Sequence, residues 1–148
     1  MTLREKLEST MHEAMRAKDV ITRDTIRMVF SAIKQVEVET RQVVDDTAIL
    51  SILQKEIKIR TETISELSSS DRTDLIEKAK KEISILERFL PKQLTDEDLS
   101  AIIRKVMNDL SASNPSDIGK VMKTVLPMVK GQAQPDRVNR IVKELLNG

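Results

Sequence analysis

The stretch Phe89-Leu90-Pro91-Lys92-Gln93-Leu94-Thr95-Asp96-Glu97-Asp98 decides the fold of this chain. The apolar helical repeat that runs into Leu90 ends at Pro91, because proline lacks an N–H and its ring disfavours helix at the preceding residue. Thr95 then offers an N-cap oxygen, and the three acids after it place negative charge in the first turn of a new helix. One helix therefore ends and another begins within about five residues.

Residues 1–91, on the N-terminal side of this stretch, predict four helices. Apolar residues recur there every three or four positions, with breaks at 19–22, 42–47 and 68–71. The link 68–71 is so short that the third and fourth helices should pack as a long antiparallel hairpin.

Residues 95–148, on the C-terminal side, predict three more helices. Asn114-Pro115 suits the start of a helix, and Gly131 suits a left-handed position after one. We therefore expect an all-α protein with two domains. An N-terminal four-helix domain with the long antiparallel hairpin, residues 1–91, is followed by a small C-terminal three-helix bundle, residues 95–148.

The composition limits the class of protein. Of 148 residues, 39% are apolar and 33% charged, and only two are aromatic, which indicates a helix-rich protein with an aliphatic core. The absence of cysteine excludes disulfides and thiolate metal sites. No apolar run approaches about 18 residues, and the first residues begin an amphipathic helix rather than a signal peptide. We therefore expect a cytoplasmic protein that does not enter a membrane.

No catalytic or metal-binding motif is evident. His12 is the only histidine and has no partner of its kind, and the serines at 68–70 are explained as turn and capping residues. Gly119-Lys120 lacks the other residues of a phosphate-binding loop. The sequence therefore predicts no active site, no metal and no cofactor.

Two residues depart from the helical pattern around them. Arg60 falls on an apolar stripe between Ile57 and Ile64, and we expect it to form a structural ion pair rather than a ligand contact. Gly119 lies inside a predicted helix, where glycine costs roughly 1 kcal/mol relative to alanine. We expect it to allow close approach of a neighbouring helix rather than to contact a ligand.

Positive charge gathers near the C-terminus, although the net charge of the whole chain is only +1. Up to Pro91 the chain has 16 basic and 17 acidic residues, whereas residues 117–148 have six basic and three acidic. A basic rim on a small helical bundle is typical of a surface that follows a phosphate backbone. The candidate RNA-binding residues are Lys120, Lys123, Lys130, Arg137, Arg140 and Lys143.

Several segments together resemble the YqeY-like family. They are Ile85–Leu94, which reads ILERFLPKQL, Asp117–Met122, Leu126–Gly131, Val138-Asn139, Arg72-x-Asp74-Leu75 and Arg27-Met28. The resemblance covers essentially the whole chain. It departs from the family at Lys123, where a glycine is usual, and at Gln132 and Gln134.

The C-terminal half of such proteins is similar to the tail domain of the B subunit of the tRNA-dependent amidotransferase. That tail touches the elbow of tRNA, while the chemistry belongs to domains absent here. The resemblance therefore implies that Lys120, Lys130 and Val138-Asn139 are positions of the tail signature, and it implies no active site.

Two functions are consistent with these features. The first is a non-catalytic accessory protein that associates with tRNA or other RNA, at most assisting an amidotransferase or another tRNA-handling complex. The alternative is a protein–protein adaptor that uses the helical hairpin and binds no RNA. Exposed Met or Leu side chains outside the apolar stripes would favour the adaptor, and a continuous positive surface would favour RNA. The sequence leaves open whether RNA is bound, the identity of the partner, the oligomeric state and the role of the N-terminal domain.

Overall fold

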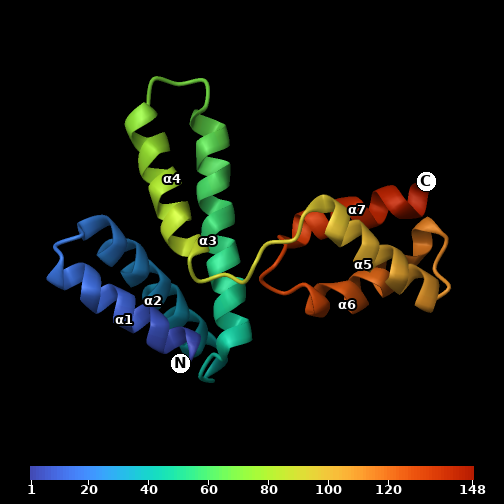
Figure 1. Cartoon of the computed structure of the whole chain (residues 1–148), viewed down its shortest axis with the longest axis horizontal. Coiled ribbons are helices and arrows are strands. Elements are labelled where there is room, and N and C mark those ends of the chain that lie inside the picture. The colour runs from blue at the N-terminus through green and yellow to red at the C-terminus, as the bar shows by residue number, and fades with distance from the viewer. The chain divides into compact units, whose positions relative to one another are not determined.

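The computed structural model describes residues 1–148, and all its regular structure is helical, which confirms the predicted all-α class. The chain divides into two compact units, Met1–Leu90 and Pro91–Gly148, each with its own apolar core (Figure 1). Its helices are α1 (Leu3–Arg16), α2 (Val20–Thr40), α3 (Asp46–Leu67), α4 (Thr73–Glu87), α5 (Asp96–Asp109), the short 3-10 helix η1 (Pro115–Asp117), α6 (Ile118–Met128) and α7 (Pro135–Asn147).

Helices α1 and α2 pack against each other, and the break between them is shorter than predicted. Lys18 has a φ of 58° and lies just after the end of α1. Asp19 then caps α2, because its carboxylate accepts hydrogen bonds from the backbone N–H of Thr22 at 3.2 Å and from the Thr22 hydroxyl at 2.7 Å. The helix therefore begins at Val20, inside the segment 19–22 that was expected to be a break.

Helices α3 and α4 pack side by side as a hairpin (Figure 1). Arg60 on α3 is only 6% exposed. Its Nε donates to Glu82 of α4 at 2.7 Å, and its Nη1 donates to the Glu56 side chain at 3.2 Å and to the Glu56 carbonyl oxygen at 2.9 Å. The predicted structural ion pair is confirmed, and it involves two acids rather than one.

The core of the first unit is aliphatic, as the composition predicted. Burial of such side chains is the main force that holds a small helical unit together, at about 25 cal/mol for each Å² removed from water. The buried residues of this core come from all four helices and are Leu3, Leu7, Ile26, Val29, Ile33, Ile49, Ile52, Leu53, Ile57 and Leu86.

Helix α4 ends at Glu87, three residues before the predicted end at Leu90. The N–H of Leu90 instead donates to the carbonyl oxygen of Glu87 at 3.1 Å, in a tighter turn. Pro91 has no N–H with which to bond the Glu87 carbonyl and disfavours helix at the residue before it. The effect of proline therefore begins about one helical turn earlier than expected.

The residues after Pro91 are bonded into the second unit. The side-chain amide of Gln93 donates to the carbonyl oxygen of Gly131 at 2.8 Å, and the N–H of Leu94 donates to the carbonyl oxygen of Gln132 at 2.9 Å. Gly131 has the predicted left-handed conformation, with a φ of 78°. These bonds fix residues 93–94 against the turn between α6 and α7.

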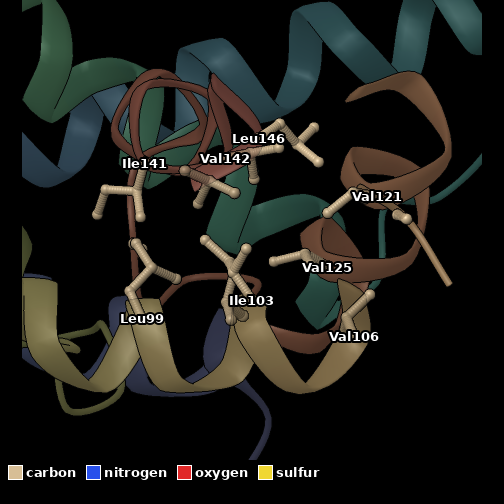
Figure 2. Packing of buried hydrophobic residues seen from close by; sticks show 12 residues of the cluster. Leu99, Ile103, Val106, Val121, Val125, Ile141, Val142 and Leu146 are labelled. Carbon is tan, nitrogen blue, oxygen red and sulfur yellow. The ribbon is translucent and has the colours of Figure 1, made fainter. Parts of the chain in front are cut away.

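Helices α5, α6 and α7 surround the core of the second unit, in which Leu99 and Ile103 meet Val125 and Val142 (Figure 2). Thr95 caps α5 as predicted: its hydroxyl accepts the N–H of Asp98 at 3.1 Å, and the Asp98 carboxylate accepts the N–H of Thr95. Each of these three helices therefore packs one apolar side against the core and leaves its other side exposed to solvent.

Candidate nucleic-acid interface

The six candidate RNA-binding residues lie on α6, on α7 and in the turn between them. On α6, Lys120 and Lys123 are both exposed, on the side away from the core. The ammonium group of Lys120 lies 3.9 Å from the Asp117 carboxylate and 3.4 Å from the carbonyl oxygen of Leu110. Lys120 is therefore held at the N-terminal end of α6, whereas Lys123 forms no ion pair.

Asp117 orders the turn that leads into α6. Its carboxylate accepts the backbone N–H groups of Ser113 at 3.1 Å and Asn114 at 3.2 Å. These two hydrogen bonds, that of Asn114 first, lower the pKa of Asp117 because they favour the charged carboxylate. The turn thereby sets where Lys120 emerges from the helix.

Arg137 and Arg140 on α7 are both bound to one acid, Asp96, at the start of α5. Their guanidinium groups lie 3.2 Å and 3.3 Å from the two oxygens of the Asp96 carboxylate. Arg137 also donates to the carbonyl oxygen of Leu94 at 2.6 Å, and Arg140 also pairs with Glu144 at 3.2 Å. The bonds to Asp96 and then to Glu144 raise the pKa of Arg140. Both arginines therefore join α7 to the unit and are not simply free cations.

Lys130 and Lys143 complete the set. Lys143 is exposed on the outer side of α7, and Lys130 is half-buried in the turn before Gly131. Neither ammonium group takes part in an ion pair. With Lys123, they are the three members of the predicted set whose charge is not shared with an acid of the unit.

The expectation that Gly119 allows a neighbouring helix to pack closely is wrong. It is exposed in the first turn of α6, and a Cβ atom built on it would meet nothing within 4 Å. No neighbouring helix approaches it, so the second unit does not require a glycine here. The backbone of α6 is instead open to solvent beside Lys120 and Lys123.

Sequence reasoning missed the role of Asp96. It was assigned only to the negative first turn of α5, because its pairing with the arginines depends on how α5 and α7 pack. The sequence did contain one signal for this pairing. An acid follows a helix cap, and another predicted helix of the same bundle carries two arginines three residues apart.

The structure has no group of His, Asp or Glu side chains arranged to hold a metal ion. None of its helices combines the length and the apolar character that a membrane crossing needs.

The fold and this surface define a two-unit, all-helical protein whose second unit carries clustered lysines. The family model for YqeY-like proteins matches residues 4–146. The chain therefore belongs to the YqeY-like family, as the resemblance in its sequence implied.

Fungal proteins are among its curated relatives. The protein named "Altered inheritance of mitochondria protein 41, mitochondrial" is 25% identical in Pyrenophora tritici-repentis, over 95% of this chain and 79% of that protein. The protein of the same name in Kluyveromyces lactis is 34% identical over 74% of this chain and 61% of that protein. An uncharacterised protein of Schizosaccharomyces pombe is 32% identical over 64% of this chain and 73% of that protein. The chain thus spans about three fifths to four fifths of these relatives.

These relatives contradict the expectation of a cytoplasmic location. The proteins from Pyrenophora, Kluyveromyces and Lachancea are all named as mitochondrial. The expectation rested on the absence of a signal peptide and of cysteine, and neither feature distinguishes the cytosol from other compartments. The prediction of a cytoplasmic location is therefore wrong.

Proposed function

We propose that this protein is a non-catalytic accessory factor that binds tRNA, or RNA of similar shape, through its second unit. The proposal is supported chiefly by the outer side of α6, where Lys120 and Lys123 flank the open backbone at Gly119. Lysine side chains and backbone N–H groups are common partners of phosphate oxygens. A phosphate can approach the backbone of α6 here more closely than it could approach a helix whose backbone is covered by side chains.

The six candidate residues divide into two groups in this proposal. The lysines, Lys120, Lys123, Lys130 and Lys143, contact phosphates directly. Arg137 and Arg140 contribute only when a phosphate replaces Asp96 as their partner, because both are bound to that acid in the free protein.

The proposed mode of recognition is by shape and phosphate position. The only aromatic residues, Phe30 and Phe89, belong to the core region of the first unit. The second unit therefore offers no aromatic ring on which a base can stack, and stacking is the usual basis of single-strand recognition. A folded RNA such as tRNA presents the fixed array of phosphates that such a surface needs. The family resemblance to the amidotransferase tail supports the same class of ligand.

The proposal is tested by measuring the affinity for fluorescently labelled tRNA at several salt concentrations. If about four phosphates are contacted, raising the salt from roughly 50 to 200 mM should weaken binding about 100-fold. Lys123→Glu with Lys143→Glu should nearly abolish binding. The control is Arg104→Glu with Lys105→Glu, which makes the same charge change at exposed positions of α5. Equal losses in the two double variants, or no binding by the wild type, would overturn the proposal.

The adaptor remains a second candidate because of one observation on the first unit. Met28, Ile59 and Leu75 are exposed there, at 51%, 45% and 36%. Exposed side chains of this kind were the feature expected of an adaptor.

A further inference from the structure

A groove runs over the surface of the first unit where α2, α3 and α4 meet. One part has a volume of about 380 Å³ and includes Met28, Lys78 and Glu82 in its lining. The same three residues also line a second hollow of about 220 Å³, which extends the groove to Val20 and Ile21 at the start of α2. The two hollows therefore form one continuous feature.

The groove is lined by half of the large apolar side chains that the chain exposes. These five residues are Val20, Ile21, Met28, Ile59 and Leu75. Apolar side chains that are exposed singly need no explanation, but a contiguous set around a hollow is typical of a binding surface. Their arrangement on three helices suits the apolar side of a fourth helix laid between them.

The acids along the groove are already engaged by groups of the first unit. At its floor, Glu56 and Glu82 share the guanidinium of Arg60, and their side chains are only 14% and 12% exposed. On the α2 side, Asp24 pairs with Arg23 at 2.9 Å. That hydrogen bond is the main reason why the pKa of Asp24 is lowered, and Lys78 contributes only a smaller attraction.

The far end of the groove continues into a further hollow that contains Asp19, Lys81 and Arg88. Asp19 is engaged as the cap of α2, through its hydrogen bonds to Thr22. Those bonds are the main cause of its lowered pKa, and Arg88 adds only a weak attraction.

Unlike these acids, the cations on the α4 side of the groove are not engaged by groups of the first unit. Lys78, Lys81 and Arg88 are all exposed and take part in none of the unit's ion pairs. Their spacing of three and seven residues places Lys78 and Lys81 on α4 and Arg88 at its C-cap in one row, about 15 Å long at 1.5 Å per residue. The charge that the groove offers to a partner is therefore a row of cations along one edge.

We propose that this groove binds an amphipathic helix of a partner protein, with apolar residues toward the groove and acidic residues toward α4. A helix of about three turns matches the length of the cation row. This inference is independent of RNA binding by the second unit. It assigns the first unit a docking role and names the chemistry of its partner.

The test begins with a library of displayed 18-residue helical peptides. Apolar residues are fixed at positions i, i+3, i+4 and i+7, and the flanking positions vary among Glu, Gln and Lys. Selection against the full-length protein should enrich Glu on one flank only. Enrichment of Lys, or no enrichment at all, would overturn the proposal.

The best acidic peptide is then measured against single variants by fluorescence anisotropy. Lys78→Glu should weaken its binding about ten-fold, because it replaces an attraction by a repulsion. Lys34→Glu makes the same charge change at an exposed position of α2 that does not line the groove, and it should have little effect. Equal effects of the two variants would show that only overall charge matters and would overturn the proposal.

The apolar contact and the identity of the occupant are tested together. Ile59→Lys should abolish peptide binding, whereas Val38→Lys, at a 68% exposed position outside the groove, should not. Sedimentation of the free wild type and of Ile59→Lys tests the other occupant, a second copy of this chain. A dimer that Ile59→Lys dissociates would overturn the proposal, as would peptide binding unchanged by Ile59→Lys.

Discussion

The guanidinium of Arg60 on α3 lies 2.7 Å from the carboxylate of Glu82 on α4, and the same group serves Glu56 one turn away. One buried cation is therefore shared by two nearly buried carboxylates, one on its own helix and one across the hairpin. Removing the arginine leaves both carboxylates without their partner in a poorly hydrated site, which costs more than the group contributes when it is complete.

Arg60→Leu should therefore destabilise the first unit strongly, by about 3–5 kcal/mol. The triple variant Arg60→Leu, Glu56→Leu and Glu82→Leu removes all three charges and should recover most of that loss. Urea unfolding followed by circular dichroism measures both. If the single variant Arg60→Leu were as stable as the wild type, the two acids would not depend on this arginine.

Asp96→Asn should free the two arginines of α7 from their shared acid, while Arg137 keeps its bond to the Leu94 carbonyl oxygen and Arg140 keeps its pair with Glu144. The second unit should lose little stability, since these pairs lie at the surface and are screened by solvent. If Arg137 and Arg140 join RNA binding once they are free, the affinity for tRNA should rise more than the removal of one negative charge explains.

The matched control for that experiment is Asp109→Asn, which removes the same charge at an exposed position near the other end of α5. Equal gains in affinity for the two variants would show that only net charge matters. In that case the arginines are purely structural.

Gly119→Ala separates stability from binding. An alanine Cβ meets nothing at this position, so the variant should stabilise α6 by about 0.5–1 kcal/mol. Binding of tRNA should weaken if phosphates approach the backbone there. A variant that gains stability and keeps full affinity would remove Gly119 from the interface.

Limited trypsin digestion should cut first after Arg88 or Lys92 and leave two helical fragments. Both residues are exposed and lie within two residues of the boundary between the two units, whereas residues 93–94 are hydrogen-bonded to 131–132. Mass spectrometry identifies the sites. First cuts within 95–148, or loss of both halves without a stable fragment, would show that the units do not fold separately.

Helix number and class followed from the sequence because apolar periodicity and caps are local signals. Thr95 and Arg60 were interpreted correctly since the partners they need are set by helix geometry and by a short hairpin. Gly119 and Asp96 were not, because their surroundings depend on which helices meet in three dimensions. The groove was missed for the same reason: Met28, Ile59 and Leu75 lie on three different helices, and no sequence window contains them.

The two separate cores have a consequence for synthesis of the chain. All the buried residues of the first core precede Leu90. This core can therefore form while the ribosome is still synthesising the rest of the chain. The second core includes Leu146 on its last helix. At about 5–20 residues per second, roughly 3–11 s pass between these two residues. In the last part of that interval α5 and α6 have been made but lack the helix that covers them, and the nascent protein is then most open to aggregation or to capture by a chaperone.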